Sequence, residues 1–112
     1  MAGFIKGDVV VVPFPFSDLA SSKRRPALVL ARSGSNDFIL SQITSNTVED
    51  KYAIEINPAD FNSGGLNVTS NIRPNKLFTA EASIIVYKAG SLKREKTDEV
   101  VGAINNLLET GG

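Results

Sequence analysis

The chain has 112 residues, 42% of them apolar, so it can bury one small core but not two. Twelve basic residues balance twelve acidic ones, which excludes a strong overall field toward nucleic acid or membrane, and any anion site must be local. Histidine and cysteine are absent, which excludes disulfides and Ser-His or Cys-His nucleophiles and leads us to expect no metal site and no cofactor.

Short β-branched runs separated by turn residues recur about every ten residues along the chain. The first run contains Pro13 and Pro15, which cannot donate to a ladder, so its second half is expected to be an edge or a loop. The expected strands are Val9–Phe16, Ala27–Arg32, Asp37–Ile43, Tyr52–Asn57, Lys76–Ala80 and Ala82–Tyr87. This pattern predicts a mainly β protein, a small antiparallel sandwich or barrel.

A polar loop, residues 16–23, joins the first two of these runs and ends in Arg24-Arg25-Pro26. The apolar run that starts at Ala27 follows at once. Adjacent cations at the mouth of a buried strand hold fixed positive charge beside a rigid wall, an arrangement that suits a phosphate. This loop is the first indication of a protein that handles a phosphodiester.

The last segment, Arg94–Glu109, has the apolar period of one helix face. We expect a helix there that packs on the β structure, and a flexible connection or single turn over Asn62–Thr69. No repeat or linker divides the chain, so residues 1–112 are expected to form a single domain. No apolar run approaches the roughly 20 residues of a membrane span, and residues 1–6 lack the apolar centre of a signal peptide. We therefore expect a cytoplasmic protein with no membrane partner.

Four stretches, in this order and spacing, resemble the MazF/PemK family of toxin ribonucleases. They are Gly7-Asp8-Val9-Val10, Arg25-Pro26-Ala27-Leu28-Val29-Leu30, Ile43-Thr44 and Ile72-Arg73-Pro74-Asn75-Lys76-Leu77. Each motif alone is weak, but together they cover nearly the whole chain from Lys6 to Leu108. The expected C-terminal helix also falls where that family has one.

The resemblance implies an SH3-like antiparallel barrel of the MazF/PemK/CcdB type with a C-terminal α-helix. It also implies a homodimer that inhibits growth by cleaving single-stranded RNA at selected sequences without a metal ion. The implied protein partner is a cognate antitoxin, small, acidic and partly disordered, that occupies the RNA groove.

Arg25 and Thr44 are the first two catalytic candidates. A permanently charged arginine is a poor proton donor but a good preorganised clamp for phosphorane charge, and the family places its catalytic arginine at Arg25. The resemblance gives Thr44 a contact to the reacting phosphate. The residues alone leave a plainer reading open for each: Arg25 as a surface cation paired with Asp18 or Glu81, and Thr44 as a strand-end threonine that satisfies its own backbone.

Arg73 is the third catalytic candidate, also by resemblance. One branch of the family has Arg-x-Asp here, but this chain has Arg73-Pro74-Asn75, and an amide cannot accept a proton at neutral pH. Phe78 likewise stands where several relatives have another arginine. The general base assigned to that branch is therefore missing. Asp18 and Glu81 could substitute, although solvated ion pairs are the plainer expectation for both.

RNA recognition requires rings, amides and cations near the same groove. If Phe16 is exposed, its ring can stack on a base, while the polar side chains read base edges and the cations contact phosphates. The candidate RNA-binding residues are Phe16, Lys23, Arg24, Gln42, Ser45, Asn46, Asn75 and Lys76.

Two other functions remain open. A related barrel family poisons DNA gyrase through the end of its last helix, typically with a tryptophan, and this chain has no tryptophan. Asn75 and Phe78 leave open a catalytically weak relic that binds RNA or an antitoxin. Metal-free RNA cleavage, trapped gyrase cleavage, or RNA binding without cuts would distinguish these functions.

Overall fold

The computed structural model describes residues 3–14, 23–46 and 51–112. Its strands are β1 (Asp8–Phe14), β2 (Lys23–Ser33), β3 (Asp37–Thr44), β4 (Ile54–Ile56), β5 (Phe61–Gly64), β6 (Ser70–Glu81) and β7 (Tyr87–Leu92). Two 3-10 turns, η1 (Pro58–Asp60) and η2 (Ala82–Ile84), and the helix α1 (Arg94–Thr110) complete the described elements.

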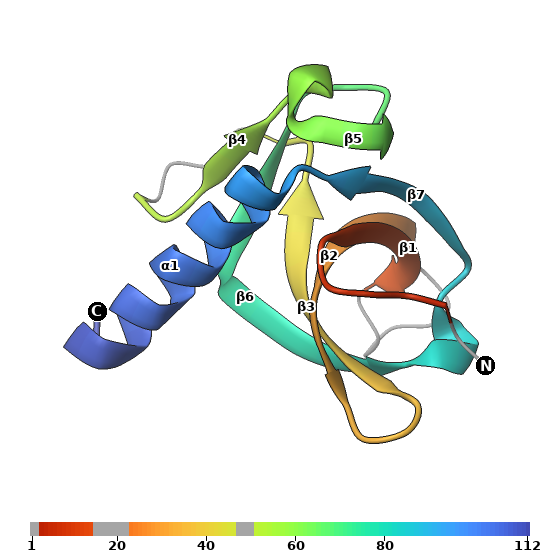
Figure 1. Cartoon of the computed structure of the whole chain (residues 1–112), viewed down its shortest axis with the longest axis horizontal. Helices are drawn as coiled ribbons and strands as arrows, with labels where there is room; N and C mark the ends of the chain where they lie inside the picture. The colour runs from red at the N-terminus through yellow and green to blue at the C-terminus, as the bar shows by residue number, and fades with distance from the viewer. Residues whose placement is uncertain (1–2, 15–22, 47–50) are drawn as a thin grey trace.

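The strands form one sheet in the order β4-β6-β3-β2-β1-β7-β5, and all neighbouring pairs run antiparallel. The sheet curls into a half-barrel, and α1 crosses one side of it next to β6 (Figure 1). The expected mainly β fold, a small SH3-like antiparallel barrel with a C-terminal helix, is confirmed.

Apolar residues alternate along the central strands and build a core on each face of the sheet. On one face, Leu28 and Ile43 pack with Val100 and Ile104 of α1. On the other face, the curled sheet encloses a second cluster, Val10, Val12, Ala27, Val29, Phe38, Leu40, Ala80 and Ile85. The helix therefore contributes side chains to only one of the two cores.

The helix and the central strands match the expectation, whereas the segment from β5 to β7 does not. The segment expected to be a flexible connection contains most of β5, and β6 begins at Ser70 rather than at Lys76. The expected strand Ala82–Tyr87 is wrong: its first three residues form η2, and the strand there is β7. The described part of the chain contains no helix long and apolar enough to cross a membrane.

Two facing glycines explain why β5 and β7 were missed. Gly64 pairs with Gly90, and Gly64 has a φ of +63°, which an L side chain rarely adopts. A Cβ at Gly90 would lie 2.7 Å from the carbonyl oxygen of Ser63. The two strands approach too closely for side chains at this pair, so glycine is needed where it would ordinarily indicate a turn.

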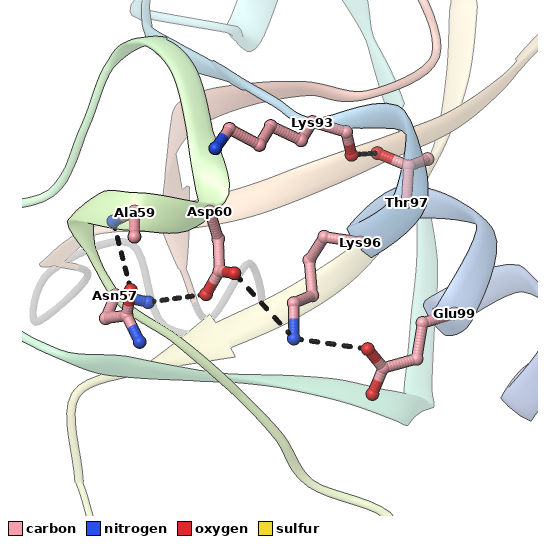
Figure 2. Close-up of polar contacts among 7 residues, drawn as sticks. All are labelled: Asn57, Ala59, Asp60, Lys93, Lys96, Thr97 and Glu99. Carbon is pink, nitrogen blue, oxygen red and sulfur yellow. Dashed lines mark hydrogen bonds and ion pairs between the residues drawn. The ribbon is translucent and has the colours of Figure 1, made fainter.

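A polar network fastens η1 to the first turns of α1 (Figure 2). The backbone N–H of Asn57 donates to Asp60 Oδ2 at 2.9 Å, and Asn57 Oδ1 accepts from the N–H of Ala59 at 3.0 Å, which closes a capping box. Lys96 Nζ lies 3.9 Å from Asp60 Oδ1 and 3.1 Å from Glu99 Oε1. Lys96 is 20% exposed, so this network holds the β4–β5 connection against the helix.

Candidate nucleic-acid interface

The gap between β2 and β3 opens at one end of the sheet. The β1–β2 ladder continues to Phe14 opposite Lys23, but the β2–β3 ladder begins only at the pair Ala27 and Gln42. Pro26, which has no N–H, is the last residue of β2 before that ladder. A pocket of about 210 Å³ lies at this opening, and its lining includes Arg24, Arg25, Ser45, Leu66, Val68 and Ser70.

Arg25 lies within a strand, not at the end of a loop as expected. It is opposite Val12 on β1 and is half-buried, while Lys23 and Arg24 before it are exposed. The ladder to β1 fixes the backbone of all three residues. Arg25 therefore has the rigid support that the sequence predicted, but the support begins earlier in the chain.

Thr44, the last residue of β3, is 6% exposed. Its Oγ1 accepts a hydrogen bond from the N–H of Asn46 at 3.1 Å, so the plainer reading, a threonine that satisfies its own backbone, describes part of its role. The hydroxyl hydrogen can still donate to a second group. Ser45 and Asn46, which follow, are exposed.

The β3–β6 ladder places Arg73 opposite Gln42 and Asn71 opposite Thr44. Because every second residue of a strand points to the same side, these pairs and Arg25 share one face of the sheet. We call this the site face, and it carries Arg25, Gln42, Thr44, Asn71 and Arg73. Val12 and Ala27 of the second core lie on it too, so the site face is the polar continuation of that core.

A bulge in β6 follows Arg73. The pairing goes from Arg73 opposite Gln42 to Leu77 opposite Ser41, so Pro74, Asn75 and Lys76 form the bulge between these two ladder pairs. Asn75 is half-buried and Lys76 is exposed. The buried Ser41 donates its hydroxyl hydrogen to the carbonyl oxygen of Arg73 at 2.7 Å, which fixes the start of the bulge. Pro74 thus lies inside a strand, at the kind of position where a strand tolerates proline.

Glu81, one of the two carboxylates suggested as substitutes, is not at this site. Glu81 is opposite Asp37, at the other end of the β3–β6 ladder, and its Oε1 accepts from the hydroxyl of Ser83 at 2.8 Å. Its suggested pairing with Arg25 is therefore wrong. Asp18, like Phe16, lies outside the described residues.

Three features of the site were missed from the sequence. They are Ser41, which anchors the bulge, the pocket wall formed by Leu66 to Ser70, and Glu55, which lies opposite Asn71 on β4. The neighbours of Glu55 follow from the strand register and not from any sequence motif. No group of three or more His, Cys, Asp or Glu residues that could hold a metal ion is found among the described residues.

The profile of the family described as "PemK-like, MazF-like toxin of type II toxin-antitoxin system" matches residues 5–108. This chain belongs to that PemK/MazF toxin family. The expected resemblance is confirmed over nearly the full length. No curated protein sequence matches the chain.

Solved structures of MazF toxins have the same fold. A MazE–MazF complex (Form-II) from Deinococcus radiodurans has a TM-score of 0.75 at 18% identity and covers 97% of this chain and 98% of that chain. An endoribonuclease in complex with its cognate antitoxin, from a mycobacterial species, has a TM-score of 0.72 at 14% identity, with coverages of 97% and 96%. The Mycobacterium tuberculosis toxin MazF-mt6 has a TM-score of 0.67 at 18% identity, with coverages of 89% and 96%.

Proposed function

We propose that this PemK/MazF protein is a metal-independent endoribonuclease that cleaves single-stranded RNA at selected sequences and so inhibits growth of the cell. The observation that carries the proposal is the position of Arg25, Thr44 and Arg73 on one sheet face, with Arg25 also lining the pocket at the opening between β2 and β3. These are the three candidates that the family motifs identify.

Metal-free cleavage proceeds when the 2'-hydroxyl attacks the adjacent phosphate, and the negative charge on that phosphate rises in the transition state. Arg25 is the proposed clamp for this charge, because the β1–β2 ladder holds it in place and half-burial strengthens its field. Arg73, from the neighbouring part of the site face, is the second cation. Thr44 donates its hydroxyl hydrogen to a non-bridging phosphate oxygen.

The RNA strand is proposed to follow the exposed polar residues around this face. Lys23, Arg24 and Lys76 contact flanking phosphates, which makes binding salt-dependent. Gln42, Ser45, Asn46 and Asn75 hydrogen-bond to base edges and supply the sequence selection, and Phe16 stacks on a base.

We further propose that the protein is a cytoplasmic homodimer held inactive by a cognate antitoxin. The similar structures include an endoribonuclease in complex with its cognate antitoxin and a MazE–MazF complex, which supports such a partner here. A small acidic segment suits the cations of the site face, since its carboxylates can replace RNA phosphates.

The test is cleavage of a long single-stranded RNA in EDTA by the wild-type protein, Arg25→Ala and Arg32→Ala. Arg32 is the matched control at the other end of β2, where it is exposed and its guanidinium lies 5.9 Å from the Phe38 ring centroid. We expect Arg25→Ala to lose about 100- to 1000-fold in rate and Arg32→Ala to remain active. Wild-type protein that leaves the RNA intact would reject the proposal.

The alternative function is binding of RNA or antitoxin without cleavage. The observation that favours it is Asn75, an amide in the bulge beside Arg73 where a carboxylate would be needed. In that case RNA would bind with a salt-dependent affinity and stay uncut. A gyrase-directed toxin would instead trap cleaved supercoiled DNA and ignore RNA.

A further inference from the structure

The strand position of Glu55 places its carboxylate on the site face. It lies in the middle of β4, opposite Asn71, which is itself opposite Thr44 on the next strand. Paired residues in an antiparallel ladder point to the same side, so the three side chains leave the sheet together. The flanking Ile54 and Ile56 point to the opposite face, into the helix-side core.

Several of the other described carboxylates already have a bonding partner. Asp8, Asp60, Glu81 and Glu99 are each held by an ion pair or hydrogen bond. Glu55 is exposed, and within the described residues no ion pair or side-chain hydrogen bond holds its carboxylate. It lies on β4, an edge of the sheet, where RNA can approach without obstruction by a further described strand.

The spacing of the strands places the Glu55 carboxylate and the Arg25 guanidinium on two sides of Thr44. Adjacent strands lie about 4.8 Å apart, so the backbones of Thr44 and Glu55 are roughly 10 Å apart across β6. Arg25 lies on the far side of Thr44. This arrangement leaves room for a ribose and its phosphate between a carboxylate and an arginine. In an in-line displacement the attacking and leaving oxygens lie on opposite sides of phosphorus, so a base beside the 2'-hydroxyl leaves the non-bridging oxygens free to face Arg25.

We propose that Glu55 is the general base of this site and supplies the carboxylate that Asn75 lacks. This inference rests on the proposed ribonuclease function. Arg73 is a diagonal neighbour of Glu55 in the β4–β6 ladder, at a spacing of about 7–8 Å. Its positive charge offsets the repulsion between the Glu55 carboxylate and the RNA phosphates.

In the proposed step, the 2'-hydroxyl proton passes to the Glu55 carboxylate as the 2'-oxygen bonds to phosphorus. The bond from phosphorus to the 5'-oxygen breaks, its electron pair goes to that oxygen, and the oxygen takes a proton from water. Glu55 then returns its proton to the hydroxide that is left, so the sum is one 2',3'-cyclic phosphate and one 5'-hydroxyl.

The experiment compares single-turnover cleavage of RNA in EDTA by wild type, Glu55→Gln, Glu55→Asp and Glu81→Gln. Glu81→Gln is the matched control, an exposed glutamate at the other end of β6. Affinity is measured separately for an RNA whose 2'-hydroxyl at the cut site is replaced by hydrogen. Circular dichroism checks that each variant is folded.

We expect Glu55→Gln to lose at least about 100-fold in cleavage rate while binding the uncleavable RNA as tightly as wild type or more tightly. Glu55→Asp should keep part of the rate, and Glu81→Gln all of it.

Wild-type activity with an equally active Glu55→Gln would overturn this inference and leave the proposed ribonuclease intact. A Glu55→Gln variant that cleaves faster would also overturn it, because the carboxylate would then only repel RNA. A wild type that makes no cuts would instead reject the ribonuclease function itself, and this inference with it.

Discussion

Ser41 on β3 donates its hydroxyl hydrogen to the carbonyl oxygen of Arg73 on β6, across 2.7 Å. The bond spans the place where the register of the two strands shifts. Ser41 is fully buried, whereas Arg73 reaches the site face. A core side chain therefore determines where the bulge begins and which way Arg73 is presented.

Ser41→Ala should destabilise the protein and lower its activity together. The substitution leaves the Arg73 carbonyl without its buried donor, which costs about 1–3 kcal/mol in the free energy of unfolding. Urea denaturation measures this loss. Ser83→Ala is the control, because Ser83 makes its bond to Glu81 on the exposed surface, and it should change stability by less than about 0.5 kcal/mol. Equal effects of the two substitutions would contradict the anchoring role.

The predictable part of this fold consists of the elements with uninterrupted apolar periodicity. Alternation predicted β3, and the 3-4 spacing predicted α1 to within one residue at its end. The strands that were missed owe their pairing to other causes. Gly64 and Gly90 allow β5 and β7 to approach closely, and Pro74 lies in a bulge of β6. From one sequence, glycine and proline are predicted to end a strand, because whether a strand can contain them depends on its partner strand.

The residues of the candidate site also fall into those that sequence motifs predict and those that only strand pairing reveals. Arg25, Thr44 and Arg73 were identified from motifs in the sequence, and the ladders bring them to one face. Glu55 has no motif, and it joins this face only through a register of two successive ladders, from β3 to β6 and from β6 to β4. That register is set by tertiary pairing, so no local pattern could have singled out Glu55.

Gly90→Ala and Gly102→Ala should change stability in opposite directions. A Cβ at Gly90 would lie 2.7–2.8 Å from backbone atoms of Ser63 and Gly65, so the β5–β7 pair must separate at a cost of about 1–3 kcal/mol. Gly102 is in α1 with open space around it, and alanine there should add about 0.5–1 kcal/mol. Thermal unfolding of both variants measures the difference. A neutral Gly90→Ala would show that the two strands need not lie so close.

Lys88→Met should destabilise the start of β1. Asp8 is 1% exposed; its Oδ2 accepts from the N–H of Ile5 at 2.9 Å, and its Oδ1 lies 3.2 Å from Lys88 Nζ. Within the described residues Oδ1 accepts no hydrogen bond, so Lys88 is the group that offsets the burial of its charge. Losing a partner of a buried pair costs about 3–5 kcal/mol, and we expect about 1–3 kcal/mol here because Lys88 is 44% exposed.

The matched control for Lys88 is Arg94→Met. Arg94 Nε lies 3.8 Å from Asp98 Oδ2, and their side chains are 91% and 60% exposed. A pair this exposed contributes about 0–1 kcal/mol, so denaturant midpoints should shift clearly for Lys88→Met and little for Arg94→Met. If both midpoints stay unchanged, water rather than Lys88 satisfies Asp8.

Asn75→Asp tests whether the Arg73 bulge belongs to the site. Asn75 is half-buried two residues after Arg73, so a carboxylate there can accept a proton from a 2'-hydroxyl held near Arg73. We expect the substitution to raise cleavage modestly in the wild type, where Glu55 already acts, and by about tenfold or more in the Glu55→Gln variant. Single-turnover rates in both backgrounds measure this difference. Asn75→Ala is the control, since it changes the side chain without adding a base. A rate that stays unchanged in both backgrounds would place the bulge outside the reacting groups and leave Arg25 and Thr44 as the groups that contact the scissile phosphate.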